Sequence, residues 1–306
     1  MANETALCGV LCLDKPRDMT SHDAVAIARR VFGTKQVGHT GTLDPMATGV
    51  LPILVGRAAK ASSFLVCDEK RYTVGLKLGI TTDTEDTTGT VLTACAQLPT
   101  EAQVRAVLEQ FRGAGMQIPP MYSALKVDGK KLVDLARKGI TVERKPRPIT
   151  VFSLVLLEAD PQAGEYLLDV VCSKGTYMRT LCADIGAALG CGGAMCSLRR
   201  TRSGNFTIDS AITVEQLRTL TPEECAARLL PLSQVFADLP QVRLADFFAR
   251  LARCGAPLYQ KKLRTTYQVG QRVTLWAGDV FFALGEAVET PEGSAIKPIK
   301  QFVLET

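Results

Sequence analysis

The stretch GHTGTLDPMATGVLPILVG, residues 38–56, surrounds a single carboxylate, Asp44, with glycines and threonines. Because a proline disfavours helical conformation in the residue before it, Pro45 predicts that Asp44 lies on a stiff, extended loop. The glycines permit close approach of the backbone to a ligand. Composition alone favours a simpler interpretation, an Asp-Pro turn that leads into the buried strand VLPILVG. The surroundings of the segment decide between the two.

Helix and strand signals alternate irregularly on either side of this segment. Helices are predicted after Ser21, after the capping box of Thr100 and Gln103, and after that of Thr221 and Glu224. Alternating or β-rich strands are predicted at 72–79, 149–158 and 165–172. The order lacks a regular βαβ rhythm, so the pattern favours the α+β class.

The last part of the chain has a different pattern. A boundary is expected near residues 238–240, followed by a helical pattern at 242–255 and then by strands. This division predicts two domains, 1–239 and 240–306, of which the second is a small β module near the lower size limit for an independent core.

Composition indicates a globular protein, with 46% hydrophobic and 22% charged residues among 306. The formal net charge is +5, and the stretch from residue 126 to 147, with eight basic and three acidic residues, matches this excess by itself. A local basic surface of this kind favours an RNA or phosphate ligand. Its basic residues are Lys126, Lys130, Lys131, Arg137, Lys138, Arg144, Lys145 and Arg147.

Several function classes lose support. The ten cysteines form no CxxC pair and the chain has two histidines, which disfavours a zinc site. No P-loop and no strand-linked GxGxxG is present, which disfavours nucleotide hydrolases and dinucleotide-binding enzymes. No secretory signal and no apolar run of membrane-spanning length is visible, so we expect a cytoplasmic protein.

The segment around Asp44 closely resembles the catalytic motif of the TruB family, the enzymes that make the T-loop pseudouridine of transfer RNA. Further motifs resemble the family in the same order over about residues 8–240. They are LDKP (13–16), EKRY (69–72), TTDTEDTTG (81–89), PPMYSALKVDGKKLVDLARKG (119–139), CSKGTYMRTL (172–181) and LRRTRSGNF (198–206).

The resemblance implies a mixed-sheet catalytic domain with an RNA-gripping thumb segment at about 119–147, followed by a tail that loosely resembles the PUA RNA-binding domain. It implies isomerisation of the T-loop uridine, position 55 of tRNA, to pseudouridine after the base is flipped out. No cofactor or metal is expected, because nothing is oxidised and no group is transferred. The expected partner is the T arm of tRNA, bound by a monomer that requires no protein partner.

The resemblance also implies roles for individual residues. Asp44 is the carboxylate that assists cleavage, by attack on the ribose, by attack on uracil carbon 6 or through a glycal route. Tyr72 stacks on the flipped uracil, and its hydroxyl is available to the carbon-5 proton. Tyr177 and Leu198 line the same pocket, although an ordinary core position is an alternative for each of these aromatic and aliphatic side chains.

Other residues are assigned to substrate or RNA. His39 is expected to stack in the space that the flipped bases leave. Lys15 and Asp86 are expected at the substrate site, the first supporting the Asp44 loop and the second ordering the pocket. The residues expected to bind RNA phosphates are Lys126, Lys130, Lys131, Arg199, Arg200 and Arg202. For each of these basic runs a solvated surface is the alternative.

Arg179 is predicted from the residues themselves to pair with an anion. It falls in the first turn of a helix that is expected to begin near Gly175–Thr176, where a cation is disfavoured by roughly 0.3–1 kcal/mol. A compensating carboxylate is therefore expected, and Asp44 is the candidate. The alternative is a surface arginine that meets RNA phosphate.

Three other functions remain open at this stage. A guide-RNA-dependent pseudouridine synthase shares the catalytic motifs. A non-catalytic tRNA-folding protein would keep the RNA surface without using Asp44. A metal-dependent RNA hydrolase would use the acidic turn of Asp83, Glu85 and Asp86, for which a solvated turn is the preferred interpretation.

Overall fold

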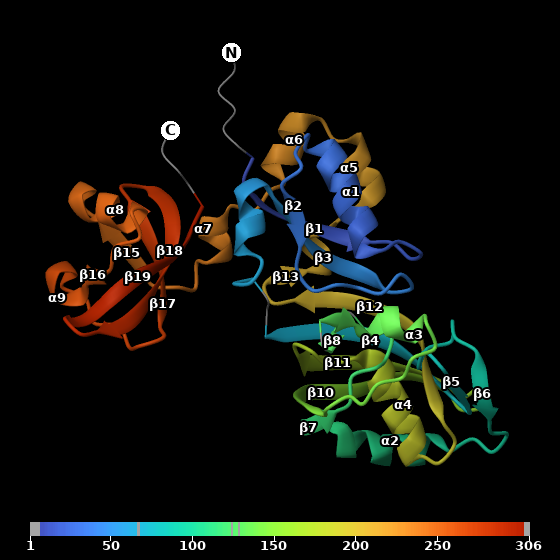
Figure 1. The fold of residues 1–306 in the computed structure, drawn as a ribbon. Coiled ribbons are helices and arrows are strands. Elements are labelled where there is room, and N and C mark those ends of the chain that lie inside the picture. The colour runs from blue at the N-terminus through green and yellow to red at the C-terminus, as the bar shows by residue number, and fades with distance from the viewer. Residues whose placement is uncertain (1–6, 66–67, 124, 128, 303–306) are drawn as a thin grey trace.

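The computed structural model describes residues 7–65, 68–123, 125–127 and 129–302. Two separate β-sheets dominate these residues (Figure 1). The larger sheet runs through most of the chain up to residue 213, and the smaller one is formed by its last part. Within the described ranges, no helix is long and apolar enough to cross a membrane.

The larger sheet is mixed, with strand order β14-β1-β3-β12-β4-β11-β10-β7; β2 pairs with β3, and β13 with β12. Most neighbours are antiparallel, but β1 runs parallel to β14 and β3 parallel to β12. Its strands are β1 (Gly9–Lys15), β2 (Val37–His39), β3 (Thr48–Val55), β4 (Glu69–Leu78), β7 (Gly113–Gln117), β10 (Arg147–Asp160), β11 (Glu165–Ser173), β12 (Gly193–Ser203), β13 (Phe206–Thr207) and β14 (Ile212–Thr213).

Helices cover the two halves of this sheet separately. α4 packs on β12 and β4, and α2 packs on β10 and α4, whereas α1 packs on β3 and α5 (Figure 1). The helices are α1 (Ser21–Val31), α2 (Glu101–Leu108), α3 (Leu132–Ala136), α4 (Met178–Ala188), α5 (Val214–Thr219), α6 (Pro222–Ala227), α7 (Leu232–Val235), α8 (Asp246–Arg253) and α9 (Gln260–Leu263), with short 3-10 turns at Gly56–Ala61, Glu109–Phe111 and Ile208–Ser210.

Local sequence signals explain these helix boundaries. Capping boxes begin α2 at Thr100 and α6 at Thr221, as predicted. α1 is capped by Thr20, whose side chain accepts a hydrogen bond from the Asp23 N–H. Ser21 is already inside the helix, and its hydroxyl instead bonds both the N–H and the carbonyl of Leu43 in the loop that carries Asp44. The start of α1 therefore anchors that loop.

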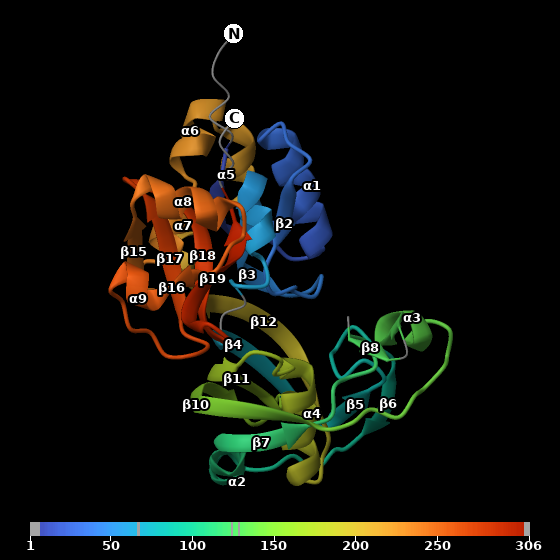
Figure 2. The ribbon, with the colours of Figure 1, turned by 60° about the vertical axis from the view of Figure 1, so that its left-hand side comes forward.

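Two small hairpins stand apart from the large sheet. β5 (Ile80–Thr82) pairs with β6 (Val91–Ala94), and β8 (Lys126–Val127) pairs with β9 (Lys130–Lys131). Figure 2 shows β8 and α3 standing out from the sheet on the same side as β5 and β6. The projecting segment that contains β8, β9 and α3 lies within residues 119–147, the part of the chain that resembles an RNA-gripping thumb.

The smaller sheet has the order β15-β17-β18-β19-β16, with α8 and α9 packed beside it. Its strands are β15 (Gln241–Leu244), β16 (Leu258–Tyr259), β17 (Arg272–Ala277), β18 (Val280–Thr290) and β19 (Gly293–Gln301). The predicted helix over 242–255 was wrong at its start, because Val242 and Leu244 alternate as buried positions of β15 and the helix begins only at Asp246.

A shared apolar cluster joins the two sheets. Phe236 contacts Phe281 of β18 and Phe302, the residue directly after β19, and the same cluster includes Val10 of β1 and Leu54 of β3. The α+β class and the small C-terminal β module are confirmed. The division into two domains at residue 240 stays a prediction, because the two parts bury a common set of side chains.

Candidate active site

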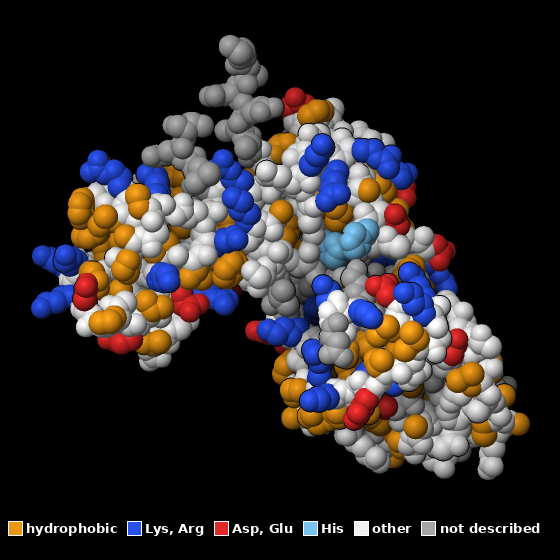
Figure 3. Space-filling view, in the orientation of Figure 1, with side chains coloured by type: hydrophobic (Ala, Val, Ile, Leu, Met, Phe, Trp, Pro, Cys, Tyr) orange, Lys and Arg blue, Asp and Glu red, His pale blue; other side chains and the backbone are white. Residues whose placement is uncertain are grey.

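A cavity of about 280 Å³ opens between the loop that precedes β3, the strands β4 and β12, and the segment that leads into α4. Figure 3 shows a hollow in this region between the two halves of the larger sheet, with a histidine patch on one side and Lys and Arg side chains on the rim. The cavity is lined by Gly41, Thr42, Leu43, Asp44, Lys70, Tyr72, Ser123, Gly175, Thr176, Tyr177, Met178, Arg179 and Leu198.

Asp44 and Arg179 meet in this cavity as an ion pair. Arg179 Nη2 lies 3.0 Å from Asp44 Oδ2, with 7% of the arginine side chain and 41% of the aspartate side chain exposed. The pair expected from the helix dipole is therefore present, although α4 begins at Met178, later than expected. The difference in exposure leaves the carboxylate accessible from the cavity and the guanidinium behind it.

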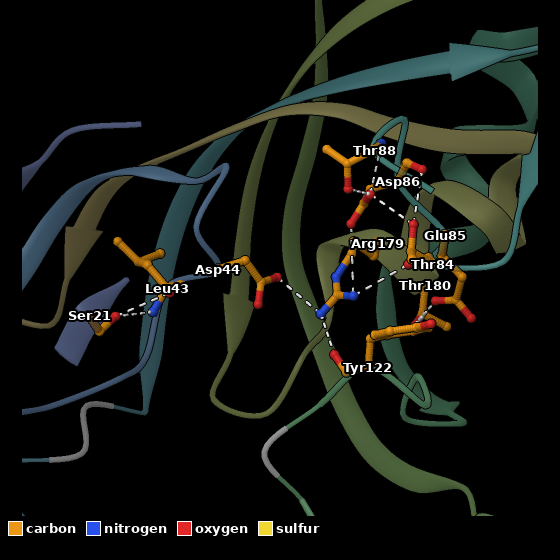
Figure 4. Close-up of polar contacts among 10 residues, drawn as sticks. All are labelled: Ser21, Leu43, Asp44, Thr84, Glu85, Asp86, Thr88, Tyr122, Arg179 and Thr180. Atoms are coloured by element: carbon orange, nitrogen blue, oxygen red, sulfur yellow. Dashed lines mark hydrogen bonds and ion pairs between the residues drawn. The ribbon is translucent and has the colours of Figure 1, made fainter. Parts of the chain in front are cut away.

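Arg179 is held by more than Asp44 (Figure 4). Its Nη2 donates to the Tyr122 carbonyl at 2.6 Å and its Nη1 to the Thr84 carbonyl at 3.3 Å. Asp86 Oδ2 lies 3.9 Å from Nη1. The guanidinium thus joins the Asp44 loop, the acidic turn and the thumb segment at one buried point, which fixes the direction in which Asp44 can be approached.

The acidic turn is an ordered part of this site. Asp86 is buried, and its Oδ1 accepts hydrogen bonds from Thr84 Oγ1 and from both N–H and Oγ1 of Thr88. Asp83 and Glu85 point elsewhere, to the Thr90 N–H and the Thr180 hydroxyl. Asp86 therefore orders the pocket, as expected, through Arg179 and the turn itself, and it does not line the cavity.

Tyr72 lies on β4 at the cavity wall and is 7% exposed. Burial raises the pKa of its phenol, which the nearby Arg200 opposes only in part. The phenol is therefore neutral near pH 7, which favours a packing or hydrogen-bonding role over that of a phenolate base. Tyr177 and Leu198 line the same cavity, so all the residues predicted to surround the base are brought together.

Lys15 supports the Asp44 loop from inside the protein. It is fully buried, and its Nζ donates to the carbonyls of Pro16, Met19 and Pro45. The Pro45 carbonyl belongs to the residue directly after Asp44. The expected support of the Asp44 loop is therefore present, whereas a direct contact of Lys15 with substrate is contradicted, since its side chain is fully buried and does not line the cavity. Its place on β1, two residues after buried Leu13, was the available signal.

The pH dependence of protein stability tests whether the buried Lys15 side chain carries a charge. Burial lowers the pKa of Lys15 from 10.5 to about 8, although Asp44 opposes the change. Between these values the unfolded chain binds more protons than the folded chain, so the contribution of Lys15 to the free energy of unfolding rises with pH. The difference between wild type and Lys15→Met, from urea unfolding, is expected to rise by about 3 kcal/mol over this window. A pH-independent difference would contradict the buried charge.

Arg200 corrects another prediction. It was expected to bind RNA phosphate, but it is fully buried, and its Nε and Nη2 donate to the carbonyls of Val50 and Gly41. Arg199 pairs with Asp14 at 2.8 Å, and Arg202 pairs with Glu69. Both of these remain partly exposed, so phosphate contacts by Arg199 and Arg202 stay predictions.

Two glycines near Asp44 lie close to this buried arginine. Gly49 has φ +101°, and a Cβ there would lie 2.2 Å from the Arg200 carbonyl oxygen. At Gly41, with φ +66°, a Cβ would lie 3.2 Å from Arg200 Nη1. Glycine is favoured at both positions by the positive φ, and at Gly49 also because β3 pairs with β12 beside Arg200.

The other predicted residues do not belong to the described lining of the cavity. His39 ends β2, and its ring makes an edge contact with His22 at 5.7 Å between centroids. Burial lowers its pKa, so the ring is neutral near pH 7. Lys126 and Lys130 are exposed on the projecting hairpin, whereas the Lys131 side chain lies outside the described part of the structure.

Sequence reasoning missed several residues at this site. Lys70 lines the cavity and shares a face of β4 with Tyr72, two residues away, so strand alternation was the signal for it. Ser123 also lines the cavity, and its buried hydroxyl has no partner among the described atoms. No pattern in the sequence pointed to Tyr122 or Thr84, since both act through backbone carbonyls.

Comparison with known proteins gives consistent results. Residues 29–178 match the family model described as TruB family pseudouridylate synthase (N terminal domain), and residues 179–237 match tRNA pseudouridylate synthase B C-terminal domain. The chain is 42% identical over 279 residues to tRNA pseudouridine synthase B of Alkaliphilus oremlandii, covering 90% of this chain and 92% of that protein. It is 47% identical over 238 residues to that of Ralstonia pickettii, covering 77% and 75%.

Solved structures show the same fold. The chain superimposes with a TM-score of 0.73 on a chain from the crystal structure of a Cbf5-Nop10-Gar1 complex, at 28% identity, over 96% of this chain and 85% of that one. A second match, to the archaeal box H/ACA sRNP Nop10-Cbf5 complex, has a TM-score of 0.69 at 26% identity.

Proposed function

The chain belongs to the TruB family of pseudouridine synthases, and on that premise we propose that it isomerises the T-loop uridine of tRNA, position 55, to pseudouridine. The single observation that carries this proposal at the site is the Asp44–Arg179 pair, an accessible carboxylate backed by a buried guanidinium in a cavity walled by Tyr72, Tyr177 and Leu198.

The chemistry requires little beyond such a site. The bond from ribose C1′ to uracil N1 breaks, the base turns, and a bond forms from C1′ to C5, with a proton leaving C5 and one reaching N1. Asp44 is proposed to assist cleavage, by any of the three routes open to a carboxylate. Tyr72 and Tyr177 are proposed to retain the free uracil between their rings. The atoms balance without an oxidant or a co-reactant.

The RNA is proposed to lie across the hollow shown in Figure 3. The target base must leave its stack to reach Asp44, at a cost of about a few kcal/mol. His39, at the edge of the hollow, is proposed to occupy the space that the base leaves. The thumb segment supplies backbone contacts, which position RNA without reading its sequence.

Salt dependence tests the thumb contacts. Lys126→Ala and Lys130→Ala are each expected to reduce the slope of log Kd against log salt by about 1, because each removes one phosphate neutralisation. Arg105→Ala is the matched control, since Arg105 is also exposed but is paired with Glu101 on α2. The Kd of the hairpin, measured from about 50 to 200 mM salt, shows whether these lysines contact RNA phosphates. An unchanged slope in both lysine variants would place the RNA elsewhere.

Tritium release tests the proposed reaction. A T-arm hairpin labelled at uracil C5 is incubated with the protein alone, beside a hairpin of shuffled loop sequence. Release from the first and not from the second is expected. If neither hairpin releases tritium, the proposed function fails for this RNA.

Guide-RNA-dependent pseudouridylation is the second candidate, since the solved structures similar to this chain include Cbf5 in complexes with Nop10 and Gar1. The tritium-release assay distinguishes the stand-alone enzyme from the guide-dependent one. Release from a bare hairpin supports the stand-alone enzyme, whereas release only after addition of a guide RNA supports the second candidate. A non-catalytic RNA-folding role would instead leave binding without any release.

The stand-alone proposal carries further expectations. We propose a monomer that needs no protein partner and works in the cytoplasm, where tRNA is modified. A single species at the monomer mass in light scattering, with full activity of the purified chain, would support this. Activity that rises with protein concentration in parallel with a dimer would contradict it.

A further inference from the structure

Gln117 is a buried amide in an otherwise exposed strand. β7 is the edge strand of the large sheet, and of its residues only Gln117 is buried, with 3% of its surface exposed. A buried primary amide is unfavourable unless its donor and acceptor are both bonded. Its position in an edge strand therefore requires a specific partner.

That partner is the backbone of Tyr177. The Tyr177 N–H donates to Gln117 Oε1 at 2.8 Å, and Gln117 Nε2 donates to the Tyr177 carbonyl at 3.1 Å. The amide thus contacts one residue through both its donor and its acceptor, as a neighbouring strand would. Tyr177 is the residue before α4, and its own side chain makes no capping bond. This pair of hydrogen bonds, the Gln117 clamp, therefore fixes the backbone of the residue from which α4 begins.

The clamp lies between the cavity and the thumb segment. On one side, Tyr177 lines the cavity and Arg179 follows it by two residues. On the other side, Gln117 is opposite Arg147 in the β7–β10 register, so this pair closes the base of the thumb segment, of which Arg147 is the last residue. A second link runs in parallel, because Arg179 Nη2 donates to the Tyr122 carbonyl in the thumb (Figure 4).

We propose that Gln117 is a positioning residue for the isomerisation, which holds the first turn of α4 so that Arg179 and Tyr177 face Asp44 while the thumb segment grips RNA. The proposal rests on the proposed function. It differs from a purely structural role in its consequence, since loss of the clamp misplaces the groups at the cavity and leaves the exposed RNA-binding lysines unchanged.

The chain provides a matched control for this clamp. Gln260 in the C-terminal module is 4% exposed, and its amide bonds the Tyr267 backbone in the same way, with Tyr267 N–H to Oε1 at 2.6 Å and Nε2 to the Tyr267 carbonyl at 3.0 Å. Gln260→Leu removes a similar clamp away from the cavity, together with the hydrogen bond that Gln260 Nε2 donates to Ser294 Oγ at 2.7 Å. It therefore measures what the loss of such a clamp does to folding alone.

Single-turnover tritium release at saturating enzyme, hairpin Kd and thermal unfolding test the proposal. Gln117→Leu is expected to lower the single-turnover rate by about tenfold or more, since small misplacements of reacting groups have large effects, while Kd stays within about twofold. Gln260→Leu is expected to keep the rate within about twofold. Gln117→Glu keeps the acceptor and loses the donor, so its rate should fall between wild type and Gln117→Leu.

The outcomes separate the two proposals. If wild type is active and Gln117→Leu loses no more rate than Gln260→Leu, the positioning role is overturned and the clamp is structural. If Gln117→Leu does not fold, the rate of Gln117→Glu decides in the same way. A wild type that binds the hairpin without releasing tritium removes the proposed function, and the positioning role with it.

Discussion

Asp44→Asn is expected to abolish tritium release from the T-arm hairpin, with a fall in rate on the order of 10⁴-fold. The amide has nearly the same size as the carboxylate, so the cavity keeps its shape. It carries no charge, however, and neither attacks carbon nor stabilises a developing cation. Because 41% of the Asp44 side chain is exposed and Arg179 keeps its contact with Asp86, folding is expected to change little. Single-turnover release and thermal unfolding measure the two effects separately.

Asp169→Asn is the matched control for this variant. Asp169 is also paired with an arginine, Arg71 at 2.8 Å, but it lies on β11 outside the cavity lining. This control is expected to keep the full rate, and both variants are expected to bind the hairpin as wild type does. A rate for Asp44→Asn within about tenfold of wild type would show that another group carries the cleavage step.

Most of the fold was predictable because its signals are local. Capping boxes at Thr100 and Thr221 and the alternation in β4 depend on neighbours a few residues away. The strand order was not predictable, since β12 joins β3 and β4 across long separations in the chain. The false helix start at Val242 has the same cause, because pairing of β15 with β17 decides that segment and helical spacing does not.

The residues of the site likewise divide into those with a local signal in the sequence and those whose position depends on distant partners. The Asp44–Arg179 pair was predictable from a motif and from the unfavourable position of a cation at a helix start. Arg200 was mistaken for an RNA contact because three arginines within five residues look alike in sequence. Strand alternation places Arg200 on the same side of β12 as Leu198, which already indicated the interior. Gln117 had no such signal, because its partner lies 60 residues away.

Replacement of Arg179 is expected to separate stability from catalysis. Arg179→Met leaves Asp44, Asp86 and the Tyr122 carbonyl without their common donor. Loss of one partner from a buried ion pair destabilises proteins by about 3–5 kcal/mol, and loss of a preorganised charge at a reaction centre lowers rates by about 10²–10³-fold. Arg179→Lys keeps the charge, but one ammonium does not span the same acceptors, so most of the rate loss should remain.

The double variant Arg179→Met, Asp86→Asn provides the decisive comparison. Removal of the carboxylate that Arg179→Met strands in the interior should recover part of the lost stability, since a buried charge no longer lacks its partner. Activity should not recover, because Asp44 still lacks the guanidinium behind it. If the double variant regains rate in proportion to its stability, Arg179 acts only by holding the fold together, and the catalytic role of the pair is contradicted.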